Sequence, residues 1–211
     1  MTDQRLLWWN RFRYTLYTPV YDWIVGSFQS KRKQSIEQLQ ARPEDPVLLI
    51  GAGTGLDLPF LLKFTDITAV DITPAMLRRL ESRARQLELA VTTKVMDGAR
   101  LEFEDASFRV VVLHLILAVM PDPRACLQEV VRVLEPGGEV VVFDKFLPDD
   151  RRAGPLRRVI DALARFLATS INRQTRSLLE DLELEVHRDE PVAWGGLFRI
   201  LYLRKPRTGH L

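Results

Sequence analysis

Short apolar runs and segments of helical periodicity follow one another along most of the chain. The run at 47–50, bounded by a proline and a glycine, is typical of a strand buried on both faces of a parallel sheet. Strands are predicted at 47–50, 67–70, 91–96, within 110–117, and at 140–143, 184–187 and 197–203, and helices at 56–64, from 74 onward and at 123–134. This alternation predicts an α/β fold with a mostly parallel seven-stranded sheet, helices on both faces and a closing antiparallel hairpin.

Two segments lie outside this alternation. Residues 1–42 are predicted to form a helical lid before the first strand, and residues 149–180 a mainly helical insertion before the final hairpin. Because 211 residues with 46% hydrophobic content suffice for one well-buried α/β unit, the whole chain, 1–211, is predicted to be a single domain.

The first strand ends in glycines at alternate positions, Gly51, Gly53 and Gly55. Glycines let the chain turn sharply and bring its backbone against a ligand where a Cβ would collide. The pattern differs from the dinucleotide fingerprint G-x-G-x-x-G, because Leu56 occupies the place of the last glycine. It also lacks the Gly-Lys-Ser/Thr of a P-loop. The helix predicted next would direct its free N–H groups at a polar ligand on this loop.

Two carboxylates follow the second and third strands. Asp71 comes 20 residues after Gly51, so the sheet would bring it beside the glycine loop, where it could accept both hydroxyls of a ribose. The alternative is that Asp71, like Thr73, caps the next helix. Asp97-Gly98-Ala99 offers a carboxylate and adjacent N–H groups to an adenine edge, although an Asp-Gly pair alone is usually a turn. Together these residues predict a nucleoside site.

These motifs resemble those of the class I S-adenosylmethionine (SAM) methyltransferases. The glycine loop is similar to their motif I, and Leu134-Glu135-Pro136-Gly137-Gly138 is similar to their L-x-P-G-G run before the fifth strand. With Asp71 and Asp97 in the same order, the resemblance covers roughly two-thirds of the chain. It implies the Rossmann-like methyltransferase fold, with SAM as cofactor and S-adenosyl-L-homocysteine (SAH) as its product.

Finer details resemble the soluble type of bacterial phospholipid N-methyltransferases. They are the run from Gly53 to Pro59, Tyr21-Asp22 before a basic cluster, and the run from Gly196 to Tyr202. The resemblance implies methyl transfer to the amine headgroup of phosphatidylethanolamine. The ubiquinone and menaquinone C-methyltransferases share the early Tyr-Asp and the core motifs, so C- or O-methylation of a quinone precursor or another small metabolite is the alternative. A SAM-binding protein without turnover is the third possibility.

The resemblance also implies site residues. It places Tyr21 over bound SAM, as a cofactor-binding and candidate catalytic residue. His114 departs from the family pattern and is the second catalytic candidate, because an imidazole at the end of a central strand could accept a proton near neutral pH; the alternative is a histidine of the pocket wall. Asp144-Lys145 is a further departure that could alter the substrate. The other residues implied to bind SAM are Gly51, Ala52, Gly53, Gly55, Asp71, Ile72, Met76, Asp97, Gly98 and Ala99.

Basic residues are concentrated in two segments, although the net charge is only +2. Residues 1–33 carry +4 and residues 145–178 carry +5, whereas residues 34–144 carry −6. Arginines interleave with aromatic residues in the first segment, which suits a helix in a membrane interface or a lid over an apolar pocket; an ordinary docking helix is the alternative. We therefore expect peripheral contact with an anionic membrane and a lipid or small-molecule acceptor. No nucleic-acid partner is expected, because no RNA-module signature is present and the chain is not strongly basic.

Cysteine and histidine are scarce. Cys126 alone cannot form an internal disulfide, and the three histidines lack the spacing of metal ligands, so neither a disulfide nor a metal site is expected. The first residues lack the features of a signal peptide, and no apolar run approaches the ~20 residues needed to cross a bilayer. A cytoplasmic location, peripheral at the inner face of the membrane, is therefore expected.

Overall fold

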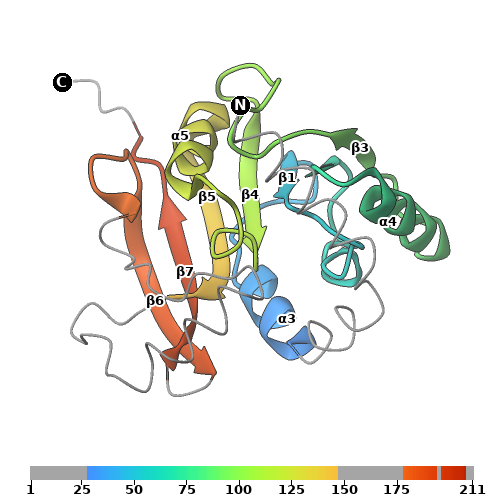
Figure 1. The fold of residues 1–211 in the computed structure, drawn as a ribbon, viewed down its shortest axis with the longest axis horizontal. Helices are drawn as coiled ribbons and strands as arrows, with labels where there is room; N and C mark the ends of the chain where they lie inside the picture. Colours follow the sequence, from blue (N-terminus) through green and yellow to red (C-terminus); the bar gives the residue numbers. More distant parts are fainter. Residues whose placement is uncertain (1–27, 147–177, 194–195, 208–211) are drawn as a thin grey trace.

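The computed structural model describes residues 28–146, 178–193 and 196–207, and within them one seven-stranded sheet forms the centre of the molecule (Figure 1). Its strand order is β3-β2-β1-β4-β5-β7-β6. The first five strands pair in parallel, and β7 pairs antiparallel with both β5 and β6. The bounds are β1 Val47–Ile50, β2 Ile67–Asp71, β3 Thr92–Val95, β4 Phe108–His114, β5 Leu134–Lys145, β6 Glu185–Ala193 and β7 Phe198–Arg204. The predicted mostly parallel sheet and its closing hairpin are confirmed.

The central position of β1 explains its continuously apolar sequence. Val47 pairs with Ile67 of β2 on one side and with Val110 of β4 on the other. Successive side chains of a strand point to opposite faces, so each face of β1 needs its own cover. The helices α3 Gln29–Glu37, α4 Pro74–Gln86 and α5 Pro123–Val133 provide that cover.

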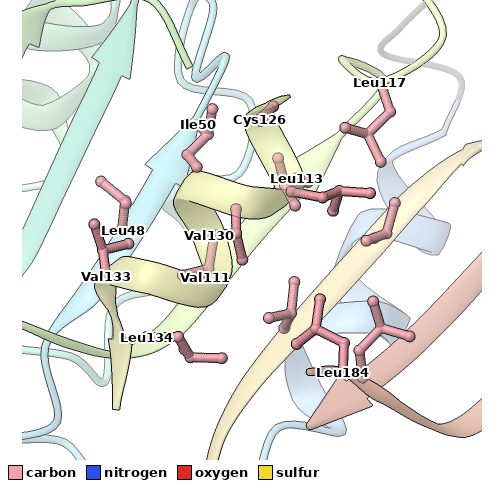
Figure 2. Packing of buried hydrophobic residues seen from close by; sticks show 14 of the residues in the cluster. Leu48, Ile50, Val111, Leu113, Leu117, Cys126, Val130, Val133, Leu134 and Leu184 are labelled. Atoms are coloured by element: carbon pink, nitrogen blue, oxygen red, sulfur yellow. The ribbon is translucent and has the colours of Figure 1, made fainter. Parts of the chain in front are cut away.

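One face of the sheet packs against α5 (Figure 2). Leu48 and Ile50 of β1 and Val111 and Leu113 of β4 meet buried residues of the helix, among them Val130. Burying a side chain of this size stabilises the fold by about 1.5–3 kcal/mol before the entropy of ordering it is subtracted. The buried residues that α5 contributes to this core are Cys126, Leu127, Val130 and Val133.

The other face packs against α3 and α4. The alternate residues of the central strands, such as Leu49 and Val112, belong to this second core. Leu77 and Leu80 of α4 and Ile36 of α3 close it. Helices therefore cover both faces of the sheet, as predicted.

Two local predictions were wrong. In place of a helix over 56–64 there is a single 3-10 turn, η1 Leu58–Phe60. Pro59 lies inside that turn, and the side chain of the preceding Asp57 makes no cap hydrogen bond there, because it contacts residues distant in the chain. Thr73 does precede α4, but its side chain also makes no cap hydrogen bond within the described chain. The glycine loop therefore lacks a long helix directing its N–H groups at a ligand.

Several predictions fall wholly or partly outside the described residues. Tyr21 and the aromatic segment before residue 28 belong here, as do residues 149–177 of the proposed insertion. Within the range proposed as a lid, 1–42, the structure describes α3. In the described ranges, no helix combines the length and apolar character required to cross a bilayer. The single-domain organisation with its two decorations stays a prediction.

Candidate active site

A pocket lies at the carboxyl ends of β1 and β2, where ligands of open α/β sheets are usually bound. Its wall includes the glycine loop, the end of β2, the turn after β3 and the loop between β4 and α5. The lining residues are Ile50, Gly51, Asp71, Ile72, Met96, Asp97, Gly98, Ile116, Val119, Met120 and Pro121. We call it the glycine-loop pocket. Half-buried carboxylates on a mostly apolar lining suit a ligand with an apolar ring and polar hydroxyls.

The glycine loop is shaped by two different constraints. Gly51 has φ +66°, and a Cβ added there would lie 2.5 Å from Cγ1 of Ile116, so neighbouring side chains exclude any larger residue. Gly53 has φ +55°, but the nearest atom that its Cβ would meet is the Gly51 carbonyl oxygen at 4.0 Å. Packing therefore does not require glycine at position 53. The positive φ favours glycine there, and the open space beside Gly53 leaves room for a ligand to approach the backbone closely.

Asp71 connects the end of β2 to the glycine loop. Its Oδ2 accepts the Gly53 N–H at 2.9 Å, and its Oδ1 accepts the Thr73 N–H at 2.8 Å. Burial raises the pKa of Asp71, while the hydrogen bonds from Thr73 and Gly53 oppose that rise. A carboxylate has about four lone-pair sites, so acceptor capacity remains for ligand hydroxyls. Asp71 thus fixes the loop and still faces the pocket.

Asp97 begins a tight turn after β3. Its Oδ1 accepts the Ala99 N–H at 3.0 Å, and its carbonyl accepts the Arg100 N–H at 2.9 Å. A Cβ on Gly98 would lie 2.6 Å from Cγ2 of Ile50, so the glycine permits close packing of this turn on β1. Because Asp97 itself uses the Ala99 N–H, that amide is less available to an adenine edge than the sequence suggested.

The loop between β4 and α5 supplies pocket residues that sequence analysis missed. Ile116, Val119, Met120 and Pro121 line the pocket from this loop, and Met96 lines it from the end of β3. The signal available was the apolar run that continues past the end of a strand of ordinary length, from Leu115 to Met120. Such a run is equally typical of a longer strand, so it did not identify a pocket wall.

Asp144, near the end of β5, fixes the loop between β4 and α5 by a hydrogen bond. The carboxylate is fully buried; its Oδ2 accepts the Ala118 N–H at 3.0 Å and its Oδ1 accepts the Lys145 N–H at 2.7 Å. Burial raises the pKa of Asp144, and the backbone hydrogen bonds oppose the rise. The chain enters the loop through Leu115, which has the left-handed φ of +59° that is uncommon for a residue of this size. The position of the pocket wall is therefore fixed by specific polar contacts.

A buried polar cluster joins α3, η1 and β4. Arg32 Nη1 donates to Asp57 Oδ1 and Oδ2 at 2.7 and 2.8 Å. His114 Nδ1 lies 2.7 Å from Asp57 Oδ1, and its Nε2 lies 3.0 Å from Ser35 Oγ. Burial alone would raise the pKa of Asp57, but Arg32 and His114 hold that pKa well below its ordinary range. Asp57 is therefore ionised throughout the neutral range.

The residues predicted to bind the cofactor mostly gather at one place. Gly51, Asp71, Ile72, Asp97 and Gly98 line the glycine-loop pocket. Their chain neighbours Ala52, Gly53, Gly55 and Ala99 complete the same two turns, and Met76 is buried in the first turn of α4. His114 lies at the carboxyl end of β4, as predicted, with its ring enclosed in the polar cluster. Tyr21 lies outside the described residues.

Several known proteins with similar sequences are methyltransferases. Residues 48–142 match a family described as a methyltransferase domain. The chain is 34% identical to a phosphatidylethanolamine N-methyltransferase of Cereibacter sphaeroides over 196 residues, 88% of this chain and 93% of that protein. It is 29% identical to a demethylmenaquinone methyltransferase of Renibacterium salmoninarum over 178 residues, 81% of this chain and 72% of that protein.

Solved structures share the fold at lower sequence identity. A geranyl diphosphate C-methyltransferase from Streptomyces coelicolor A3(2), solved with Mg2+, geranyl diphosphate and SAH, superposes with a TM-score of 0.70 at 16% identity, covering 83% of this chain and 77% of that one. The [4+2]-cyclase SpnF superposes with a TM-score of 0.74 at 18% identity, covering 92% and 94%. Because a cyclase and a methyltransferase share this architecture, these likenesses describe the fold and not the reaction.

Proposed function

Because the chain belongs to the class I SAM-dependent methyltransferases, we propose that it methylates the amine headgroup of a phospholipid, converting phosphatidylethanolamine into its N-methylated forms. The observation that carries the proposal is the 34% identity to the phosphatidylethanolamine N-methyltransferase of Cereibacter sphaeroides across nearly the full length of both chains. The cofactor is SAM. The identity of the acceptor is the proposed part.

We propose that SAM binds in the glycine-loop pocket. The open space beside Gly53 admits a ligand that a Cβ would exclude, and the half-buried Asp71 can accept ribose hydroxyls. We propose that Ile72, Met96 and Ile116 pack against the adenine, with Asp97 and Gly98 at its edge. The proposed position of Tyr21 over the cofactor rests on family resemblance alone.

The protein's contribution to the reaction is chiefly positioning. Bound SAM supplies a methyl group already activated as a sulfonium, so a strong base is not required to begin the transfer. The amine must reach the methyl group unprotonated and in line, and holding two reactants in such a geometry can supply about 7–11 kcal/mol of the barrier reduction. The role of His114 as proton acceptor stays a prediction.

A quinone precursor is the second candidate acceptor. It is supported by the 29% identity to the demethylmenaquinone methyltransferase of Renibacterium salmoninarum. The purified protein should be given methyl-labelled SAM with vesicles containing phosphatidylethanolamine, and separately with a demethylmenaquinone. Label in mono-, di- or trimethylated phosphatidylethanolamine supports the proposal. Label in the quinone alone contradicts it, and Asp71→Ala serves as the control that is expected to weaken cofactor binding in both assays.

Peripheral binding to anionic membranes is the part of the proposal that depends on charge. The basic segments 1–33 and 145–178 should attract anionic headgroups by about 1 kcal/mol per basic residue near the surface, an attraction that salt screens. Co-sedimentation with anionic liposomes should fall sharply in the triple variant Arg152→Glu/Arg157→Glu/Arg158→Glu. The matched control is Arg78→Glu/Arg79→Glu/Arg85→Glu, because these arginines are exposed on α4 and the charge change is the same. Equal binding to neutral and anionic liposomes, or binding to neither, would contradict the electrostatic attraction and favour a small-molecule acceptor.

A further inference from the structure

The cluster of Arg32, Ser35, Asp57 and His114 brings together three segments that are far apart in the chain. Arg32 and Ser35 are on α3, Asp57 lies between the glycine loop and η1, and His114 is the last residue of β4. All four are nearly excluded from solvent, with exposed fractions of 0–5%. Polar side chains enclosed in an apolar core are expected to bond to one another, because water cannot reach them. Among the described residues, Arg32 Nε is the atom of this cluster that is left without a hydrogen-bond partner.

The order of the contacts resembles that of a hydrolase triad. Ser35 Oγ lies 3.0 Å from His114 Nε2, and His114 Nδ1 lies 2.7 Å from an oxygen of Asp57. A catalytic nucleophile must be reached by its substrate, whereas Ser35 is fully buried and donates its hydroxyl to the Arg32 carbonyl at 2.7 Å. Asp57 is moreover paired with the Arg32 guanidinium. The cluster is therefore not built for acyl transfer.

Two of the three segments, those that contain Asp57 and His114, continue to the glycine-loop pocket. Asp57 is two residues beyond Gly55, so fixing its side chain fixes the end of the glycine loop. His114 is followed by Leu115, whose φ of +59° turns the chain, and then by Ile116, which lines the pocket and packs on Gly51. Displacement of Asp57 would thus move the glycine loop, and displacement of His114 would move the loop that carries Ile116.

We propose that Arg32, Asp57, His114 and Ser35 form an internal brace through which α3 positions the two walls of the cofactor pocket, and that His114 is a positioning residue. Nδ1 of His114 is directed at Asp57 and Nε2 at the buried Ser35, and His114 is not among the residues that line the glycine-loop pocket. Neither ring nitrogen is therefore placed to take a proton from the methyl acceptor. This role does not depend on which molecule is methylated.

Two substitutions of His114 distinguish a positioning role from the role of a general base. In His114→Asn the side-chain amide can replace Nδ1–H as the donor to Asp57 but cannot act as a base near neutral pH. In His114→Ala this donor is lost. For each variant, SAH affinity is measured by calorimetry, thermal stability by unfolding, and kcat separately from KM for SAM.

If the proposal is right, asparagine at position 114 restores most of the SAH affinity that alanine loses. His114→Ala should weaken SAH binding about tenfold and raise KM for SAM, because the pocket walls lose their fixed separation; tenfold corresponds to about 1.4 kcal/mol. His114→Asn should recover SAH affinity to within about threefold of the unmodified protein and retain most of its kcat, since charge-assisted donors to Asp57 are preserved. Ser35→Ala should have a smaller effect of the same kind.

A core variant controls for general destabilisation. Val133→Ala removes buried carbon at the far end of α5, so it lowers thermal stability without touching the brace. Its SAH affinity should be unchanged. The proposal is overturned if His114→Asn loses turnover by about 10²-fold or more while keeping normal SAH affinity and stability, since that is the behaviour of a lost base. It is equally overturned if His114→Ala binds SAH normally, or if Val133→Ala weakens SAH binding as much as His114→Ala does.

Discussion

Asp71 and Asp97 border the glycine-loop pocket half-buried, whereas Asp57 and Asp144 are closed off from solvent, with exposed fractions of 5% and 0%. The first pair uses part of its acceptor capacity on backbone N–H groups and presents the rest to the pocket. The second pair is occupied by protein donors: Arg32 and His114 for Asp57, and the Ala118 and Lys145 N–H groups for Asp144.

This contrast separates ligand binding from loop positioning. A carboxylate that keeps accessible lone pairs can exchange water for ligand hydroxyls, while an enclosed carboxylate can only hold the chain that surrounds it. Substitution of the accessible pair should therefore affect affinity more than stability, and substitution of the enclosed pair should affect stability at least as much as affinity.

The largest effect is expected for Asp57→Ala. It leaves the Arg32 guanidinium buried without its counter-ion, and breaking a buried pair in this way typically costs about 3–5 kcal/mol. Urea unfolding measures the loss in free energy of unfolding. Asp189→Ala is the control, because its ion pair with Arg199 is partly exposed on β6 and should contribute about 1 kcal/mol or less. Equal losses in the two variants would contradict the assignment of Asp57 to the brace.

Asp71→Ala should act mainly on the cofactor. Ribose hydroxyls would lose a charged acceptor, and hydrogen bonds to charged groups contribute about 1.5–3 kcal/mol each. Calorimetry should show SAH affinity reduced at least tenfold. Asp66→Ala, an exposed carboxylate just before β2, is the matched control and should bind SAH normally. Unchanged affinity in Asp71→Ala would rule out its role at the ribose.

Gly53→Ala tests the open space beside the glycine loop. An alanine at φ +55° costs about 1–2 kcal/mol in backbone strain, and its Cβ would enter the space left for the ligand. Gly196→Ala is the control: φ is +88° there, its Cβ would make ordinary contacts, and it lies just before β7. Both variants should lose similar stability, but only Gly53→Ala should weaken SAH binding, by about tenfold. Similar affinities in the two variants would show that strain alone explains this glycine.

The smallest effect is expected for Asp144→Asn and depends on pH. Burial raises the pKa of Asp144 above its ordinary 3.8, so the folded state binds a proton that the unfolded state has released. Its contribution to stability therefore falls as pH rises from 3.8 through the raised folded value. Asparagine cannot titrate, so the stability of the variant relative to the unmodified protein should rise with pH. Urea unfolding between about pH 4 and pH 8 measures this slope, and a flat difference would contradict the burial argument.

The predicted pH dependence of Asp57 has the opposite sign. Its folded pKa lies below the ordinary value of 3.8, so its stabilising contribution is complete above that value and is lost as pH falls toward the folded pKa. The same titration series on Asp57→Asn should therefore show a difference from the unmodified protein that is constant above about pH 5 and shrinks in stronger acid. A difference that grew in acid would contradict the ion pair.

The amino-acid sequence by itself determined which residues form the first strand, the glycine loop and the carboxylate beside it. An apolar run such as 47–50, the alternate glycines after it and Asp71 at the end of the next strand are all local features. Parallel pairing then brings the carboxyl ends of neighbouring strands to one edge, so these residues meet without further information. Gly51, Asp71, Asp97 and Gly98 of the pocket could be predicted for this reason, whereas Ile72 came from the family resemblance.

The tertiary structure alone decided the contacts of the enclosed polar residues. Arg32 and Asp57 are 25 residues apart, and Ser35 and His114 are 79 residues apart. The sequence of α3 has no apolar stripe that would indicate which face is buried, and its buried residues are Arg32, Ser35 and Ile36. Asp57, predicted to lie in the first turn of a helix, instead faces Arg32 and His114, and η1 is correspondingly short. A polar side chain gives no periodic signal of its burial, because burial is favourable only once its distant partners have been brought beside it.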